Sequence, residues 1–308
     1  MRLRPEYAIV VAFAAAAAAL PLVAGAYPLA VARSVITYMS LAVTWDMLLR
    51  SGQISFGIAG LFGLGAYASA LAVLRAGMDP LASVVFAGLF SASVAFAIGF
   101  AVLRLRTMYF SITTLALAEI FRISVQNLHD FTGGPEGVVL KSVIFGGNAP
   151  ALYWICLAGL AVALGASVWF EKSKIHLALT AIRNDETSAR SNGIGIFKYL
   201  LIAFVVTSGI QGLIGGIYVQ SSGFATPDSI FDSNYTLLPL AMALLGGIHS
   251  TIGPMLGAIL LGLASEWLKL RIPYGHLMVY GFIIMLVILF MPNGLYGLAK
   301  RAIERRKS

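Results

Sequence analysis

The sequence predicts an all-α, polytopic membrane protein, and its composition is the first reason. Of the 308 residues, 59% are hydrophobic and only 11% are charged, whereas soluble proteins average roughly 25% charged residues. A helix that crosses a bilayer needs about 20 mostly apolar residues, because it rises about 1.5 Å per residue through a hydrocarbon core about 30 Å thick. Stretches of this kind fill most of the chain. We therefore expect a single transmembrane domain over residues 1–308, without an independent soluble domain.

The first apolar run imitates a secretory signal but is too long for one. Arg2 and Arg4 precede an alanine-rich stretch, and the apolar run from Tyr7 to Ala24 has 18 residues. The hydrophobic region of a signal peptide has roughly 7 to 15 residues. Since further apolar runs follow, the sequence predicts an uncleaved first helix near residues 7–25.

Nine more apolar runs follow, separated by polar residues or by glycine and proline, so about ten membrane segments are predicted. The two runs that flank Gly253 and Pro254 are short and adjacent. They are alternatively half-helices that enter the membrane and turn back where protein buries them. The predicted segments lie near residues 7–25, 29–49, 54–74, 81–103, 109–128, 150–170, 199–221, 235–249, 251–268 and 276–292.

The positions of lysine and arginine predict the orientation, because cytoplasmic loops carry an excess of both residues. With the N-terminus inside, 15 of the 21 basic residues lie on the inner side, four on the outer side and two within segments. Both termini and the polar loop 171–198 are then cytoplasmic, and the polar loop 128–150 is outside. Basic residues beside anionic lipid headgroups also explain the net charge of +8 without a nucleic-acid partner.

The inner loop 171–198 has the pattern of a short amphipathic helix between about Ala181 and Asn192. Glu186 and Arg190 are spaced as an i,i+4 ion pair, and Gly193 is a natural left-handed helix stop. A helix of this kind lies on lipid headgroups or fits a groove of another protein, and the pattern leaves both possibilities open. Its apolar face is predicted to consist of Ala178, Ala181, Ile182 and Ala189.

Two charges, Glu119 and Arg122, lie near the middle of the fifth segment. A charge at that depth costs about 2.5–3.5 kcal/mol on insertion scales, so neither side chain should face lipid. Their spacing allows them to neutralise each other. We expect a structural ion pair that faces the bundle interior, with a substrate-binding role as the alternative. Asp46 and Arg33 lie near segment ends, where snorkelling to the interface is a sufficient explanation.

Small residues recur at every fourth position early in the third segment, as Ser55, Ala59 and Gly63. Such a face permits close helix packing, which we expect to be its main role. Segments that pack tightly also line polar paths, so Gln53 and Ser55 are candidates for a path through the bundle. The same spacing recurs at Gly212 with Gly216 and at Gly253 with Gly257.

The sequence lacks the common catalytic and nucleotide-binding signatures. It contains neither a Gly-x-x-x-x-Gly-Lys-Ser/Thr phosphate loop nor a Gly-x-Ser-x-Gly nucleophile motif. The single cysteine, Cys156, forms no intramolecular disulfide, and no two of the four histidines have the i,i+4 spacing of a helical metal site. We therefore expect no enzyme activity, metal site or cofactor on this chain.

Five stretches of the chain carry a resemblance to a known family. They read GQISFGIAGLFGLGAY at 52–67, TGGPEG at 132–137, AIRNDE at 181–186 followed by GIGIFKYL at 193–200, LGGIHSTIGP at 245–254 and FMPNGL at 290–295. With these stretches in this order, the chain resembles the LivM-type permeases of branched-chain amino acid ABC transporters. The resemblance covers about residues 45–297.

The resemblance implies a permease subunit in the bacterial inner membrane that imports branched-chain or similar hydrophobic amino acids. It also implies a second related permease subunit, two cytoplasmic ATPase subunits that bind ATP and Mg²⁺, and a periplasmic amino acid-binding protein. In that family the inner segment contacts the ATPases. This contact would involve Ala181, Ile182, Arg183, Asn184, Asp185, Glu186, Arg190 and Gly193.

Two other functions remain open from the sequence. A member of the same family could carry urea or short amides. A secondary transporter driven by an ion gradient would instead need buried charges or unwound backbone for its coupling ions, and Glu119 with Arg122 are the mid-membrane charges that the sequence offers.

Overall fold

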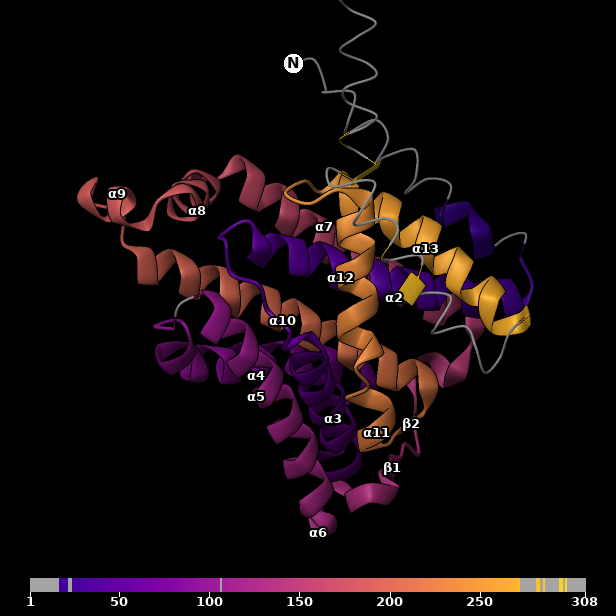
Figure 1. The fold of residues 1–308 in the computed structure, drawn as a ribbon. Coiled ribbons are helices and arrows are strands. Elements are labelled where there is room, and N and C mark those ends of the chain that lie inside the picture. Colours follow the sequence, from indigo (N-terminus) through magenta and orange to yellow (C-terminus); the bar gives the residue numbers. More distant parts are fainter. Residues whose placement is uncertain are drawn as a thin grey trace, which may run out of the picture.

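The computed structural model describes residues 17–21, 24–105 and 107–271, together with 281, 282, 285, 294, 295 and 297. Within this part of the chain nearly all regular structure is helical, as predicted (Figure 1). Among the described residues, seven helices are long and apolar enough to cross a membrane. They are α2 (Ala26–Leu49), α3 (Ile58–Ala76), α4 (Pro80–Val102), α5 (Thr107–Asn127), α7 (Ala149–Lys172), α10 (Ile196–Ser222) and α13 (Ile252–Arg271).

The shorter helices lie between these long ones. They are α6 (His129–Thr132), α8 (Lys174–Asn184), α9 (Glu186–Ser191), α11 (Pro227–Ile230) and α12 (Asn234–Gly246). Two 3₁₀ turns, η1 (Gly134–Glu136) and η2 (Ile144–Gly147), and two short strands, β1 (Val138–Val139) and β2 (Phe224–Ala225), complete the described elements.

The prediction of ten spanning segments is wrong for one of them and remains a prediction for two others. Helix α12, in the predicted segment 235–249, has 13 residues and is therefore only about 20 Å long, too short for a hydrocarbon core of about 30 Å. Helix α13 has 20 residues and is long enough. The length of α12 therefore fits the half-helix alternative, which stays a prediction, and the length of α13 does not fit it. The segments 7–25 and 276–292 lie largely outside the described residues.

Helix boundaries follow local capping chemistry. The Asp79 carboxylate accepts hydrogen bonds from the first free backbone N–H groups of α4, with Pro80 at the first helical position. Asn148 caps the start of α7 in the same way. Gly77 and Gly223 end α3 and α10 in the left-handed conformation, with φ of 62° and 76°.

Helix α10 packs closely against α3 and α4. A Cβ atom on Gly65 would collide with the backbone of Gly212, and one on Gly215 would collide with the Phe62 carbonyl group. A Cβ on Gly216 would lie 2.9 Å from the Ala87 side chain. The glycines therefore allow helix backbones to touch, which fits the small-residue packing expected for Gly212 and Gly216.

A short two-stranded sheet, called the strap below, joins residues 138–140 to residues 223–225 at one end of the bundle. β1 pairs antiparallel with β2, and the Leu140 N–H donates to the Gly223 carbonyl oxygen at 2.8 Å. Gly137, in the TGGPEG stretch, has a φ of 76° and lies against the Ala225 carbonyl group, so no side chain fits there. Figure 1 shows this strap with α6 and α11 at the end of the molecule opposite α8 and α9. The loops 128–150 and 171–198 thus lie at opposite ends.

Candidate functional site

The segment between α7 and α10 contains two helices, so the prediction of a single helix from Ala181 to Asn192 is wrong. The break falls at Asp185, whose φ of −158° and ψ of 108° are extended. The Asp185 carboxylate accepts hydrogen bonds from the backbone N–H groups of Ser188 and Thr187 and from the Ser188 hydroxyl group. These bonds cap α9 and lower the pKa of Asp185, so it is ionised at neutral pH.

The two helices turn an apolar face inward and a charged face outward. Ala178, Ile182 and Ala189 are buried, and Ala181 is half-buried. Asn184, Asp185, Glu186 and Arg190 are exposed, and Arg190 Nη2 donates to Glu186 Oε1 at 3.1 Å. Gly193 follows α9 with a φ of 78°. The segment therefore has a charged surface that nothing in the described chain covers.

Helix α8 contacts the turn between α2 and α3. Arg183, at its C-terminal end, lies over Gly52, where an added Cβ would sit 3.3 Å from Arg183 Cγ. Gly52 has a φ of 83°, so this turn needs glycine both for its conformation and for the close approach. Partial burial and the positive charges of Arg183 and Arg50 lower the pKa of His249 to about 4. The end of α8 thus lies near both the α2–α3 turn and the α12–α13 turn.

A cleft of about 780 Å³ opens between α9, the α4–α5 turn and the start of α10. Gln53 lies in its wall with its side chain largely buried, and its Oε1 atom accepts no hydrogen bond from the described residues. The other lining residues are Leu103, Arg104, Leu105, Glu186, Thr187, Arg190, Ile196, Phe197 and Leu200.

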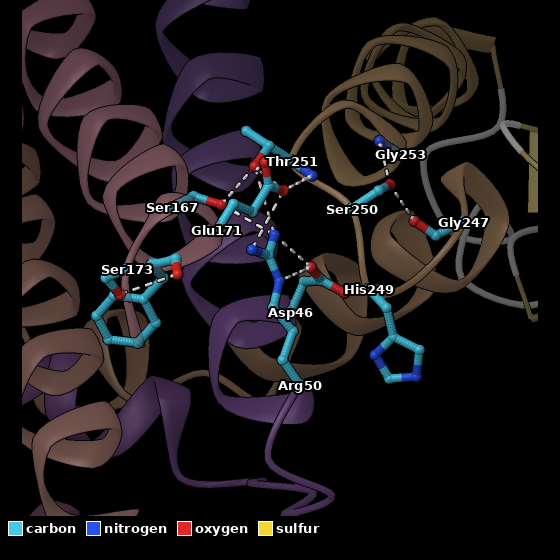
Figure 2. Close-up of polar contacts among 11 residues, drawn as sticks. Asp46, Arg50, Ser167, Glu171, Ser173, Gly247, His249, Ser250, Thr251 and Gly253 are labelled. Carbon is cyan, nitrogen blue, oxygen red and sulfur yellow. Dashed lines mark hydrogen bonds and ion pairs between the residues drawn. The ribbon is translucent and has the colours of Figure 1, made fainter. Parts of the chain in front are cut away.

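Beneath α8 lies a buried ionic network, shown in Figure 2. Arg50, with 2% of its side chain exposed, donates from Nε to Asp46 Oδ2 at 3.0 Å and from Nη2 to Ser167 Oγ at 2.9 Å. Its Nη1 atom lies 3.2 Å from Glu171 Oε1, at ion-pair distance. Thr251 donates to the same Glu171 oxygen from its hydroxyl group at 2.6 Å and from its backbone N–H at 3.0 Å.

The prediction that Asp46 snorkels to the interface is therefore wrong. Asp46 is fully buried, and its second oxygen accepts the backbone N–H of His249 at 2.5 Å. A buried carboxylate needs such partners, because desolvation without them is costly. Sequence reasoning missed this network, although Asp46 and Arg50 have i,i+4 spacing and Glu171 lies at the same predicted inner end.

The charges of α5 form the expected pair, but they do not face the interior of this chain. Arg122 Nε donates to both carboxylate oxygens of Glu119 at 3.0 Å. Arg122 Nη1 also donates to Asp228 Oδ1 of α11 at 2.7 Å, and Gln126 donates to the same atom at 3.0 Å. About half of the Glu119 side chain is exposed. The described chain thus leaves this charged face of α5 open.

The three small residues predicted to share one helix face do not all lie in α3, because Ser55 precedes this helix and its backbone is not helical. Each of them lies against another part of the chain. The Ser55 carbonyl oxygen accepts a hydrogen bond from Trp45 Nε1 at 2.9 Å, and the Ala59 N–H donates to Thr236 Oγ1 at 3.1 Å. A Cβ on Gly63 would collide with the Phe231 ring. Ser55, Ala59 and Gly63 are therefore in protein contacts, whereas Gln53 borders the cleft.

These features define a class of protein: a helical membrane protein with a charged two-helix segment fixed to its bundle and no phosphate loop in its sequence. The family of branched-chain amino acid transport system permease components matches residues 27–291, and the chain belongs to this family. Its apolar helices and this family membership make it a multi-pass protein of the bacterial inner membrane.

The chain is similar to two kinds of permease in this family. It is 28% identical to the high-affinity branched-chain amino acid transport system permease protein LivM of Escherichia coli (strain K12), over 92% of this chain and 74% of the relative. It is 27% identical to the LivH permease protein of the same organism, over 85% of this chain and 91% of the relative. No solved structure matches the chain.

Proposed function

We propose that this chain is a permease subunit of an ATP-driven importer for branched-chain or similar hydrophobic amino acids, and that α8 and α9 form its contact with a cytoplasmic ATPase subunit. The observation that carries the proposal is the exposed charged surface of α9 beside the cleft, on a segment whose other face is buried in the bundle. A helix that only lay on lipid would need its apolar face toward the membrane. Here that face packs against the protein itself.

The proposed assembly has further components that fit the same geometry. A second permease subunit related to this one would cover the open face of α5, because the Glu119, Arg122 and Asp228 charges are too costly to leave against lipid. LivM and LivH relatives, which are both permeases, support a pair of this kind. The ATPase subunits would hold ATP and Mg²⁺. A periplasmic amino acid-binding protein would deliver the substrate at the strap formed by β1 and β2.

The docking contact can be tested with charge variants of α9. We expect Glu186→Lys to reduce co-purification of the ATPase subunit at least fivefold and to reduce leucine uptake in parallel, because docked charges orient a protein contact. The permease itself should insert at a normal level, since an exposed i,i+4 pair contributes only about 0.3–0.5 kcal/mol.

Two matched variants separate docking from helix stability. Asp185→Ser removes a negative charge but keeps a residue that caps α9. Exchanging the pair, with Glu186→Arg and Arg190→Glu, keeps an ion pair within α9 but reverses the pattern that a partner meets. If the exchanged pair assembles and transports normally, the charged face of α9 does not contact the ATPase and the proposal fails.

The orientation of the chain gives a second test. We expect a cysteine introduced by Ser188→Cys on α9 to react with a membrane-impermeant maleimide only from the cytoplasmic side. A cysteine from Val139→Cys, on the exposed strand β1, should react only from the periplasm. The natural Cys156 is buried and should stay silent in both assays. Labelling of the Ser188 variant in intact cells would reverse the proposed topology.

A further inference from the structure

The buried network connects three parts of the chain that are distant in sequence. Asp46 lies in the last turn of α2 and Arg50 caps the end of this helix, Ser167 and Glu171 lie near the end of α7, and Thr251 lies in the turn before α13 (Figure 2). Thus one arginine holds together the inner ends of two spanning helices and the α12–α13 turn.

The donor and the acceptor of each hydrogen bond in this network are defined. Thr251 donates its hydroxyl hydrogen to Glu171, so the 2.7 Å contact between Ser167 and Thr251 requires Ser167 to donate. Ser167 in turn accepts from Arg50 Nη2. The chain from Arg50 through Ser167 and Thr251 to Glu171 therefore runs in one direction, and each link fixes the next.

Stability alone does not require such a network. Buried ion pairs are often replaced by apolar residues of similar volume without loss of stability, because desolvation offsets much of the Coulomb attraction. The directional bonds do supply a fixed geometry between the three segments. This geometry is what an apolar cluster of the same volume would not supply.

The network is attached to α8 at both ends of that helix. Glu171 lies two residues before Ser173, whose hydroxyl oxygen accepts the Ile175 N–H and caps α8. At the other end, Arg183 lies over Gly52, two residues after Arg50. A displacement of α8 therefore acts directly on the backbone that carries Arg50 and Glu171.

On its other side the network holds the α12–α13 turn. Asp46 accepts the His249 backbone N–H, and Glu171 accepts the Thr251 backbone N–H. Helices α12 and α13 touch through Gly246, Gly253 and Gly257, where any added Cβ would collide with backbone. The turn and the two helices are therefore expected to move as a unit.

We propose that Arg50 is a positioning residue that fixes the α8–α9 segment to the α12–α13 turn, so that a displacement of α8–α9 by an ATPase is passed to the short helix α12 and to α13. This proposal depends on the proposed function, since it needs an ATPase to act on α9. Arg50 contacts neither the ATPase nor the substrate. It acts through Asp46, Glu171 and Thr251.

The test uses the complete transporter in lipid nanodiscs or proteoliposomes, with ATP hydrolysis and leucine uptake measured on the same sample. Arg50→Met alone leaves the buried Asp46 and the partly exposed Glu171 without a cation, so we expect poor assembly. The decisive variant combines Asp46→Asn, Arg50→Met and Glu171→Gln, which removes the three charges of the network at similar volume and leaves an oxygen on residue 46 that accepts the His249 N–H. It should assemble and hydrolyse ATP, yet import at least tenfold less leucine per ATP than the wild type.

Thr251→Val gives the same test without a change of charge. It removes the hydroxyl group that joins Ser167 to Glu171, and we expect several-fold less uptake per ATP at a normal level of complex. If the triple variant does not assemble, this variant decides the outcome. Spin labels on the exposed positions Leu89 of α4 and Leu260 of α13 should show a nucleotide-dependent distance change in the wild type that Thr251→Val loses.

The two proposals fail in different ways. If wild-type transporter does not raise its ATP hydrolysis when loaded binding protein is added, the proposed function is wrong. Suppose that the wild type does raise its hydrolysis, and that the Thr251→Val variant keeps both the wild-type ratio of uptake to hydrolysis and the distance change. Arg50 and its partners are then only structural, and the proposed positioning role of Arg50 is overturned.

Discussion

Replacing Arg122 with glutamine should lower the yield of the assembled transporter at least tenfold, which corresponds to about 1.4 kcal/mol. Arg122 is shared by Glu119 and Asp228, so its loss leaves two carboxylates close together on the open face of α5 without a cation. Like charges in a poorly hydrated contact repel each other strongly. Quantitative co-purification of the two permease subunits measures this effect.

The partners of Arg122 provide matched controls. Glu119→Gln leaves Arg122 paired with Asp228 and should have a smaller effect than Arg122→Gln. A neutral triple variant with Glu119→Gln, Arg122→Gln and Asp228→Asn should recover much of the yield. Normal assembly of the Arg122→Gln variant would show that this face of α5 remains in water and is not covered by a second subunit.

Adding one methyl group to Gly215 should destabilise the bundle strongly. In Gly215→Ala the new Cβ would collide with the carbonyl group of Phe62, so α3 and α10 must separate. Overpacking of this kind typically costs about 1–3 kcal/mol, and we expect a clear fall in the thermal midpoint measured by size-exclusion chromatography after heating.

Gly165→Ala is the matched control, because an added Cβ at Gly165 meets nothing within 4 Å. This residue lies on the exposed side of α7, where alanine favours the helix by up to about 1 kcal/mol over glycine. The control should therefore be neutral or slightly stabilising. Equal effects of the two changes would contradict the close α3–α10 contact.

Hydropathy predicted the long helices well, because it depends on local composition. The predicted segments 81–103 and 109–128 differ from α4 and α5 by one or two residues at each end. It failed for α12, where an apolar run shorter than the membrane was extended to Gly247, Ile248 and His249. Apolar character alone does not show where a helix ends.

The site was harder to predict, since its contacts join distant residues. Arg50, Glu171 and Thr251 meet only after α2, α7 and α13 have packed, and no sequence period reports that. The break at Asp185 did have a local signal, because aspartate followed by Glu-Thr-Ser is a good helix start. The prediction that Glu119 and Arg122 face the bundle interior was wrong for another reason. The apolarity of a segment does not distinguish the interior of one chain from a surface that another subunit could cover.

The strap at the opposite end of the bundle has a consequence for association. Backbone bonds between 138–140 and 223–225 hold the loop before any partner arrives. A protein that docks there would not have to order a flexible segment, so little conformational entropy would be lost on binding. The two proteins would then form their complex without a slow folding step. A weak and rapidly reversible contact could still select its partner by the shape of the strap. Such a contact suits a carrier that must arrive, release its cargo and leave in every cycle.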